Sequence, residues 1–179
     1  MTTSLSTPRG QITIRAAELP DSTSLFELRL EALTHDPEAF AADVEKTTAR
    51  GVKAWEELIT EYFRDQSGVI IIACDGDKLV GMNGIVRGHW TKTRHAANLW
   101  GVYITPDYRG LRIGEAIVKG CLEWAVEHDL MVVTLGVISS NVPAIRCYAH
   151  CGFTTYGIQP KVTFYNGIYY DELLMVKLL

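Results

Sequence analysis

Apolar and polar positions follow two periods along this chain, one typical of helices and one typical of strands. Apolar residues recur at helical spacing after Pro20-Asp21-Ser22 and again over residues 54–64, and Asp36-Pro37 ends the first helix. Residues 38–50 are expected to be irregular or briefly helical. Apolar runs of strand length occupy four segments, 12–15, 69–74, 78–86 and 97–104. The turn at Asp75-Gly76-Asp77 predicts that two of these strands form a hairpin.

The second half of the chain continues this alternation. Residues 112–128 have the clearest helical pattern, with an apolar stripe on one face. The opposite face carries a charged row that we interpret as solvated surface: Arg112, Glu115, Lys119, Glu123 and Glu127. A strand over 131–138 follows, and Asn166-Gly167 predicts a type I′ turn between two long strands over 153–179. The order β-αα-βββ-α-β-α-ββ predicts one α/β domain over 11–179, preceded by a loose polar segment, 1–10.

Length, charge and cysteine usage narrow the class of protein. A chain of 179 residues suits one domain with a sizeable core, and its net charge of −4 gives no general attraction for nucleic acid or anionic membrane. The longest apolar runs fall short of the ~20 residues of a membrane span. The four cysteines show no spacing typical of a metal site, so we expect free thiols, no metal and a cytoplasmic protein. They are Cys74, Cys121, Cys147 and Cys151.

The segment from Leu99 to Val118 combines an apolar strand, a Pro-Asp turn, a basic glycine-containing loop and the start of a helix. Such a loop leaves backbone N–H groups unpaired at the positive end of the helix dipole, which is the arrangement that cradles a phosphate. The P-loop pattern G-x-x-x-x-G-K-[ST] and the dinucleotide pattern G-x-G-x-x-G are both absent. The loop therefore predicts a phosphate site of another kind.

A second group of residues follows the strand at 131–138. Asn141 can cap a helix, Pro143 has the fixed φ favoured in a first turn, and Gly152 can adopt the left-handed conformation that ends the helix. Tyr148 lies within this helix. By itself it would be interpreted as a tyrosine that packs on the sheet.

Together these two segments resemble the GNAT N-acetyltransferase superfamily. Arg109 to Gly114 resembles its motif [QR]-x-x-G-x-[GA], with Arg112 at the position of the middle glycine. The second signature, N-x-x-A-x-x-x-Y-x-x-x-G-F, is matched at Asn141, Ala144, Tyr148, Gly152 and Phe153. Residues 15–21 and 77–81 also resemble this family's opening strand-helix junction and third strand. The resemblance therefore covers nearly the whole chain.

The resemblance implies a fold and a cosubstrate. The fold is a mixed, mostly antiparallel twisted sheet with a central splayed parallel pair and helices on both faces. The cosubstrate is acetyl-CoA, whose pyrophosphate would lie on the loop before the long helix and whose pantetheine arm would pair with the open strand edge. The implied binding residues are Val102, Tyr103, Ile104, Arg109, Gly110, Leu111, Arg112, Ile113, Gly114, Glu115, Asn141, Ala144 and Tyr148.

The resemblance also implies direct acetyl transfer to a primary amine of a small molecule or peptide. A backbone N–H near Val102 would hold the negative charge on oxygen, and Tyr148 would donate a proton to the departing thiolate. Where some branches of the family carry a glutamate base, this chain has Asn98, which cannot act as one. The base therefore stays open among Glu27, Glu31, His89, His95 and a water chain.

The acceptor is not determined by the sequence. The family forms its acceptor pocket from segments that correspond here to Thr34–Arg50 and Pro160–Tyr170. The second segment contains aromatic residues that either line the pocket or form cross-strand pairs: Phe164, Tyr165, Tyr169 and Tyr170. A sensor that binds acyl-CoA without catalysis and an interaction module are the alternatives to an enzyme, and a homodimer stays open.

Overall fold

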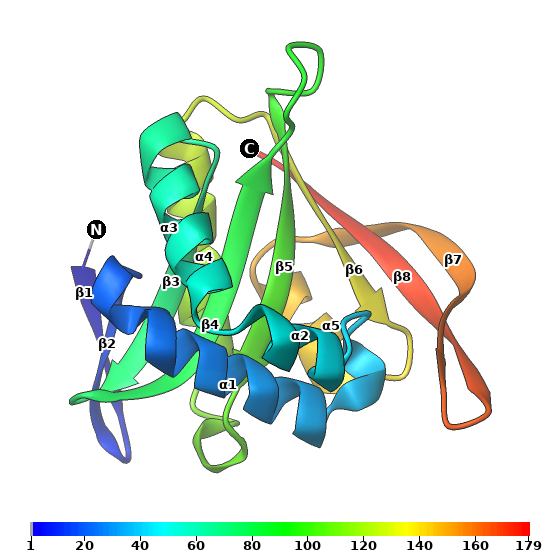
Figure 1. The fold of residues 1–179 in the computed structure, drawn as a ribbon. Helices are drawn as coiled ribbons and strands as arrows, with labels where there is room; N and C mark the ends of the chain where they lie inside the picture. The colour runs from blue at the N-terminus through cyan, green and yellow to red at the C-terminus, as the bar shows by residue number, and fades with distance from the viewer. Residues whose placement is uncertain (1) are drawn as a thin grey trace.

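The computed structural model describes residues 2–179, which form an eight-stranded sheet in the order β1-β2-β3-β4-β5-β6-β8-β7 (Figure 1). Every neighbouring pair is antiparallel except β5 and β6. The strands are β1 (Thr2–Thr7), β2 (Gly10–Ala16), β3 (Gly68–Asp75), β4 (Lys78–Arg87), β5 (Ala96–Ile104), β6 (Val132–Ile138), β7 (Thr154–Tyr165) and β8 (Ile168–Leu178). This is the mixed sheet that the sequence predicts.

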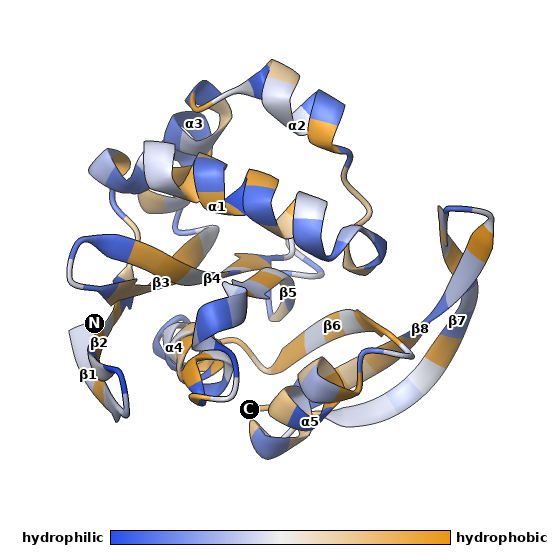
Figure 2. Cartoon of the chain, turned by 90° about the horizontal axis from the view of Figure 1, so that it is seen from below, coloured by the Kyte–Doolittle hydropathy of each residue, from blue (hydrophilic) through white to orange (hydrophobic). Residues whose placement is uncertain are grey.

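Helices cover both faces of the sheet, so that the sheet lies between two layers (Figure 2). The layer on one face contains α1 (Ser22–His35), α2 (Val44–Arg50) and α3 (Lys53–Asp65), and the other contains α4 (Ile113–Glu127) and α5 (Val142–His150). Three short 3₁₀ helices join these elements: η1 (Leu19–Asp21), η2 (Pro37–Ala39) and η3 (Pro106–Tyr108). Each face buries its own cluster of apolar side chains, one under α1 and α3 and the other under α4 and α5. No helix within residues 2–179 is long and apolar enough to cross a membrane.

The parallel pair splays apart, as the family resemblance implies. β5 and β6 pair only from Ala96 to Asn98 on β5, opposite Val132 to Thr134 on β6. The Asn98 side chain donates to the carbonyl and hydroxyl oxygens of Thr134, each at 3.2 Å, at the last paired position. Beyond this point the side of β5 that faces β6 is an open strand edge.

The same part of β5 also carries an irregularity on its other side. The register between β4 and β5 shifts between Met82 and Gly84, opposite the stretch that contains Gly101. Gly101 has a φ of 67°, in the left-handed region that favours glycine. This bulge changes the direction of the backbone just before Val102, where the resemblance places the thioester.

The N-terminal segment differs from the prediction of a loose polar stretch. Thr2–Thr7 forms β1 and pairs with Gly10–Arg15 of β2, while Met1 lies outside the described residues. Side chains support the pairing, because the Ser4 hydroxyl donates to Gln11 at 2.7 Å. The sequence of this segment lacks apolar alternation, so only the partner strand reveals that it is extended.

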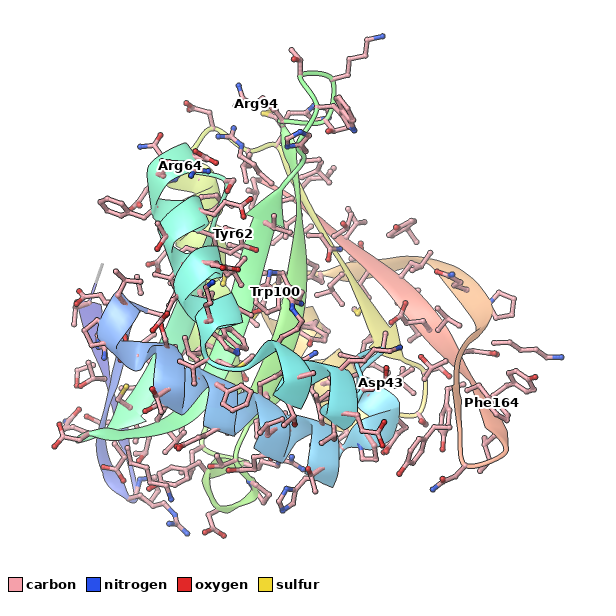
Figure 3. The ribbon with its side chains drawn as sticks, viewed as in Figure 1. Asp43, Tyr62, Arg64, Arg94, Trp100 and Phe164 are labelled. Carbon is pink, nitrogen blue, oxygen red and sulfur yellow. The ribbon has the colours of Figure 1, made fainter. Side chains whose placement is uncertain are left out.

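The C-terminal hairpin forms as predicted. Asn166 and Gly167 have φ values of 49° and 81°, the two positive values that a type I′ turn requires. Phe164 and Tyr169 face each other across the two strands with ring centroids 4.7 Å apart. Phe164 lies near the tip of this hairpin, away from the body of the sheet (Figure 3). These aromatic residues therefore form cross-strand pairs, the second of the two expected alternatives.

Candidate active site

A cavity of about 590 Å³ opens where β5 and β6 separate. Its walls come from the end of β5, the loop and first turn of α4, the start of α5 and the segment between α1 and α2. Nearly all of the predicted cofactor residues line it: Val102, Tyr103, Ile104, Arg109, Gly110, Arg112, Ile113, Gly114, Glu115, Asn141 and Ala144. Leu111 packs against the core and Tyr148 lies within it.

The loop before α4 presents free backbone donors to this cavity. The first bond of α4 runs from the Ala116 N–H to the Arg112 carbonyl at 3.2 Å. Within residues 2–179, the amides from Gly110 to Glu115 donate to no backbone carbonyl. They lie at the positive end of a helix of 15 residues, so the loop can bind a pyrophosphate as the sequence predicts. Gly114 also brings α4 and α5 close, since a Cβ there would lie 3.3 Å from the Cys147 Sγ.

The backbone of Arg112 is left-handed, which explains why the family motif usually has glycine at this position. Its φ of 61° and ψ of 15° are left-handed, and it is the N-cap residue of α4. An L-residue with a side chain pays about 1–2 kcal/mol for this conformation. Its guanidinium donates to the Glu115 carboxylate at 2.8 Å while remaining 73% exposed. Arg112 thus keeps the shape of the loop and places a positive charge at its mouth.

Glu115 is not part of a solvated surface, contrary to the interpretation of the charged row on α4. Its side chain is only 11% exposed, and its Oε1 lies 3.1 Å from His150 Nδ1 of α5. The Arg112 guanidinium lowers the pKa of this carboxyl group, and burial opposes the shift. The helical pattern could not reveal this burial, because α5 contributes the His150 side chain that covers Glu115 together with Arg112.

Arg109 holds the other end of the loop. Its Nε donates to the Ile104 carbonyl at 3.0 Å, and its Nη2 donates to the Asp36 carboxylate beyond the end of α1. The Ile104 carbonyl therefore already has a side-chain donor in this conformation.

Asn141 begins α5 in the predicted way. Its Oδ1 accepts the Ala144 N–H at 3.2 Å, Pro143 lies in the first turn, and Gly152 has a φ of 89° after the helix. The cap leaves the Nδ2 donor of Asn141 for a ligand in the cavity.

Tyr148 lies behind the cavity wall, 6% exposed, with its ring edge-on to Phe153 at 6.2 Å. Burial raises the pKa of its phenol well above the ordinary value. The group therefore stays protonated over the neutral range, as a proton donor must. Its proton is therefore held more tightly than that of an exposed tyrosine.

The side chains that the sequence offers as candidate bases lie in different environments. Glu27 is exposed, while Glu31 accepts the Tyr103 hydroxyl at 3.0 Å. His89 and His95 belong to the connection that precedes β5, at the opposite end of that strand from the cradle (Figure 1). Asn98 fixes the end of the parallel pair and has no proton-accepting role.

Sequence reasoning missed the carboxylate of Glu172 on β8. A Cβ added to Gly136 of β6 would lie 2.4 Å from its Oε2, so this carboxylate lies directly over the Gly136 backbone. Glu172 pairs in register with Ile138, which lines the cavity. It has no hydrogen bond or ion pair within the described chain, and burial raises its pKa. An isolated glutamate in a strand gives no sequence signal for such a place.

Comparison with known proteins places this site in a family. The sequence profile of the acetyltransferase (GNAT) family matches residues 25–153. A mycothiol acetyltransferase from Thermomonospora curvata is 30% identical over 151 residues, which cover 82% of this chain and 46% of that relative. A streptothricin acetyltransferase from Escherichia coli is 27% identical over 81 residues, or 41% of this chain and 47% of that protein. The matched segments span about half the length of each of these relatives.

Solved structures agree on the fold. An acetyltransferase of the GNAT family from Streptococcus pneumoniae has a TM-score of 0.84 at 24% identity, covering 94% of this chain and 99% of that one. An acetyltransferase from Salmonella typhimurium, solved with its cofactor acetyl-CoA, has a TM-score of 0.80 at 22% identity and covers 94% of both chains. The fold of the chain is therefore the fold of these two acetyltransferases. The chain belongs to the acetyltransferase (GNAT) family.

Proposed function

We propose that this protein transfers the acetyl group of acetyl-CoA to a primary amine of a small molecule or peptide, by direct attack in a ternary complex. One observation carries the proposal. A single cavity joins the amide cradle, the open edge of β5 and the segment Asp36–Phe40 beyond α1. A cosubstrate and an acceptor can therefore meet at the splay from two directions.

The chain's residues fit the parts of acetyl-CoA. The amides of Gly110 to Glu115 and the charge of Arg112 suit a pyrophosphate, and the backbone at Val102 suits the amides of a pantetheine arm. The Nδ2 of Asn141 supplies one further donor to this arm. When bound, acetyl-CoA supplies the activated acetyl group.

The transfer needs three roles from the protein. The Val102 N–H stabilises the negative charge on the carbonyl oxygen while the amine nitrogen bonds to the carbonyl carbon and the carbon–sulfur bond breaks. Tyr148 donates its phenolic proton to the departing sulfur. Glu172, over Gly136 at the splay, accepts the proton that the amine loses. The products are an acetamide and the free thiol of CoA, and proton transfer through solvent restores both side chains.

The acceptor is proposed at the level of an amine of a small molecule or peptide. The relatives and neighbours include acetyltransferases named for mycothiol, for streptothricin and for the alanine of a ribosomal protein. These names cover small molecules and a protein, so none of them selects the acceptor of this chain.

A thiol-release assay with acetyl-CoA tests the activity across polyamines, amino acids, aminoglycosides and short peptides with free N-termini. Release that depends on an acceptor, with the acetylated amine identified by mass spectrometry, is the expected result. Thermal unfolding supplies the binding test, because a ligand that binds only the native state raises the Tm with its concentration. Acetyl-CoA should raise the Tm far more than pantetheine, which lacks the phosphates. Equal stabilisation by the two, or no acceptor-dependent release from any amine, contradicts the proposal.

We also propose a cytoplasmic location and a homodimer. All four cysteines carry free thiols, which suits a reducing compartment. The hairpin of β7 and β8 exposes apolar side chains that a second copy would cover, with Phe164 61% and Tyr169 59% exposed. Sedimentation of the wild type and of Phe164→Asp tests the dimer, which the added charge should dissociate.

A further inference from the structure

The guanidinium of Arg29 on α1 is partly buried and has no hydrogen-bond or ion-pair partner within residues 2–179. Its Nη1 atom is inaccessible to solvent and makes no hydrogen bond within residues 2–179. Four other arginines have carboxylate partners: Arg15 with Asp21, Arg64 with Asp65, Arg109 with Asp36 and Arg112 with Glu115. Arg87 donates to the Arg94 carbonyl, and the remaining arginines are exposed: Arg9, Arg50, Arg94 and Arg146. Arg29 is therefore unlike them.

The guanidinium of Arg29 lies beside the bulge of β5. A Cβ on Gly101 would lie 3.7 Å from its Nη1, so the group approaches the backbone one residue before Val102. Its Cζ lies 4.6 Å from the centroid of the Phe40 ring, and Phe40 contacts Tyr103 edge-on at 6.5 Å. Both aromatic residues line the cavity. Arg29 therefore lies between α1, the segment after it and the β5 bulge, on the face of the sheet that α1–α3 cover.

Desolvating a permanent cation without an anionic partner costs free energy. Burial lowers the pKa of Arg29, in keeping with this missing partner. Stacking on Phe40 compensates part of the cost but leaves the Nη1 protons unsatisfied. An oxygen anion that enters from the cavity would satisfy both the charge and these donors.

We propose that Arg29 binds a carboxylate of the acceptor, so that the acceptor is an amine that carries a carboxylate a few atoms away, as a free amino acid does. This rests on the function proposed above. A carboxylate bound to Arg29 would lie beside Gly101, and the thioester carbonyl would lie beside Val102. Consecutive Cα atoms are about 3.8 Å apart, so an amine a few atoms from the carboxylate is within reach of that carbonyl group. An α-amino acid has both groups on one carbon. The Arg29 guanidinium then determines acceptor specificity, and the opposite charge of Glu172 faces the amine from β8.

Pairs of acceptors that differ only in the carboxylate test this role. Several L-amino acids and their carboxamides are compared by kcat/KM in the wild type, Arg29→Gln, Arg29→Lys and Arg64→Gln. Arg64 is exposed at the end of α3, far from the cavity (Figure 3), so Arg64→Gln controls for the loss of one positive charge. The ratio of acid to amide within one preparation does not depend on how much of a variant is folded.

The wild type and Arg64→Gln should favour each acid over its amide by about 10-fold or more, the scale of a hydrogen-bonded charge pair. Arg29→Gln should bring the ratio near one, mainly by raising KM for the acid, and Arg29→Lys should keep part of the preference. A wild-type ratio near one overturns the inference while leaving the acetyltransferase proposal intact. An equal loss of kcat for acid and amide in Arg29→Gln also overturns it, because Arg29 would then stabilise the carbonyl oxygen. Absence of release from every amine in the wild type contradicts the proposed function instead.

Discussion

Arg109 of the cradle and Asp36 at the end of α1 form an ion pair that links the two halves of the cavity. The Arg109 guanidinium donates to the Asp36 carboxylate, and both residues line the cavity wall. One side of this pair belongs to the proposed phosphate site and the other to the segment Asp36–Phe40 on the acceptor side. Their side chains are 47% and 31% exposed, so water screens the pair and its own stability is small.

Asp36→Asn should strengthen the binding of acetyl-CoA. The carboxylate neutralises the one cradle arginine that spans both sites, and its removal leaves a full positive charge for the pyrophosphate. We expect the Kd for acetyl-CoA, measured by calorimetry at low salt, to fall a few-fold, with a smaller effect at high salt.

Asp43→Asn is the control for this change. Asp43 pairs with Lys46 on α2 and lies on the exposed surface near the start of that helix (Figure 3). The Asp43→Asn substitution changes the net charge by the same amount as Asp36→Asn, and Asp43 does not contact Arg109. Weaker binding in Asp36→Asn than in Asp43→Asn would mean that Asp36 positions Arg109 for the phosphate rather than competing for it.

Arg112→Gly and Arg112→Ala should separate the effect of the backbone from that of the charge. Both remove the guanidinium that contacts Glu115, but only glycine relieves the left-handed φ of 61°. The glycine variant should therefore be more stable than the alanine variant by about 1 kcal/mol. Urea denaturation of the two variants measures this difference. Equal stability of the two would show that the loop relaxes out of the left-handed conformation when the arginine is absent.

Features determined by neighbouring residues could be predicted from the sequence. The Asn141 cap, the Gly152 helix end and the Asn166-Gly167 turn each depend on conformations within a few residues, and the structure shows all three. The splayed parallel pair also followed, because two matched motifs specify a family whose fold contains it. The strand over Thr2–Thr7 could not be predicted, because its polar sequence is extended only through pairing with β2.

Parts of the site that depend on distant elements were out of reach. Glu115 has the spacing of a surface residue, and its burial depends in part on the contact with His150 of α5. Arg29 and Glu172 come from distant parts of the chain, on α1 and β8, and lie beside Gly101 and Gly136 respectively. Neither lies in a motif, and what distinguishes them is the absence of a partner for a partly buried charge, which only the fold reveals.

Tyr148→Phe should leave acetyl-CoA affinity nearly unchanged and lower kcat by about 100-fold, the scale of one general acid. The ring and its contact with Phe153 remain, so stability should change little. Because burial raises the pKa of this phenol, the activity of the wild type should show no fall at moderately high pH from loss of its proton. Tyr156→Phe, at an exposed tyrosine, is the matched control. Full activity in Tyr148→Phe would show that the thiolate leaves without this donor.

Glu172→Gln should lower kcat/KM by about 100-fold if Glu172 accepts the amine proton. The acid limb of the wild-type pH profile should then stay fixed across acceptors whose amines differ in pKa, and it should disappear in the variant. Asp171→Asn changes the adjacent carboxylate, which accepts the Lys161 N–H at 2.8 Å on the exposed hairpin, and should leave the profile unchanged. A limb that moves with the pKa of the acceptor would show instead that the amine loses its proton before it binds.

Stability supplies a second, independent measurement on Glu172. Burial raises the pKa of Glu172 in the folded protein above its value in the unfolded chain. The contribution of this group to the free energy of unfolding is therefore complete below the unfolded pKa and is lost as the pH rises through the folded pKa. Glu172→Gln should therefore be more stable than the wild type at pH 8, and the difference should shrink towards pH 4. Urea denaturation across this range checks the sign. A variant that is less stable than the wild type at pH 8 would show that the ionised carboxylate has a stabilising partner in solution. The open site over Gly136 would then not be the environment of this group.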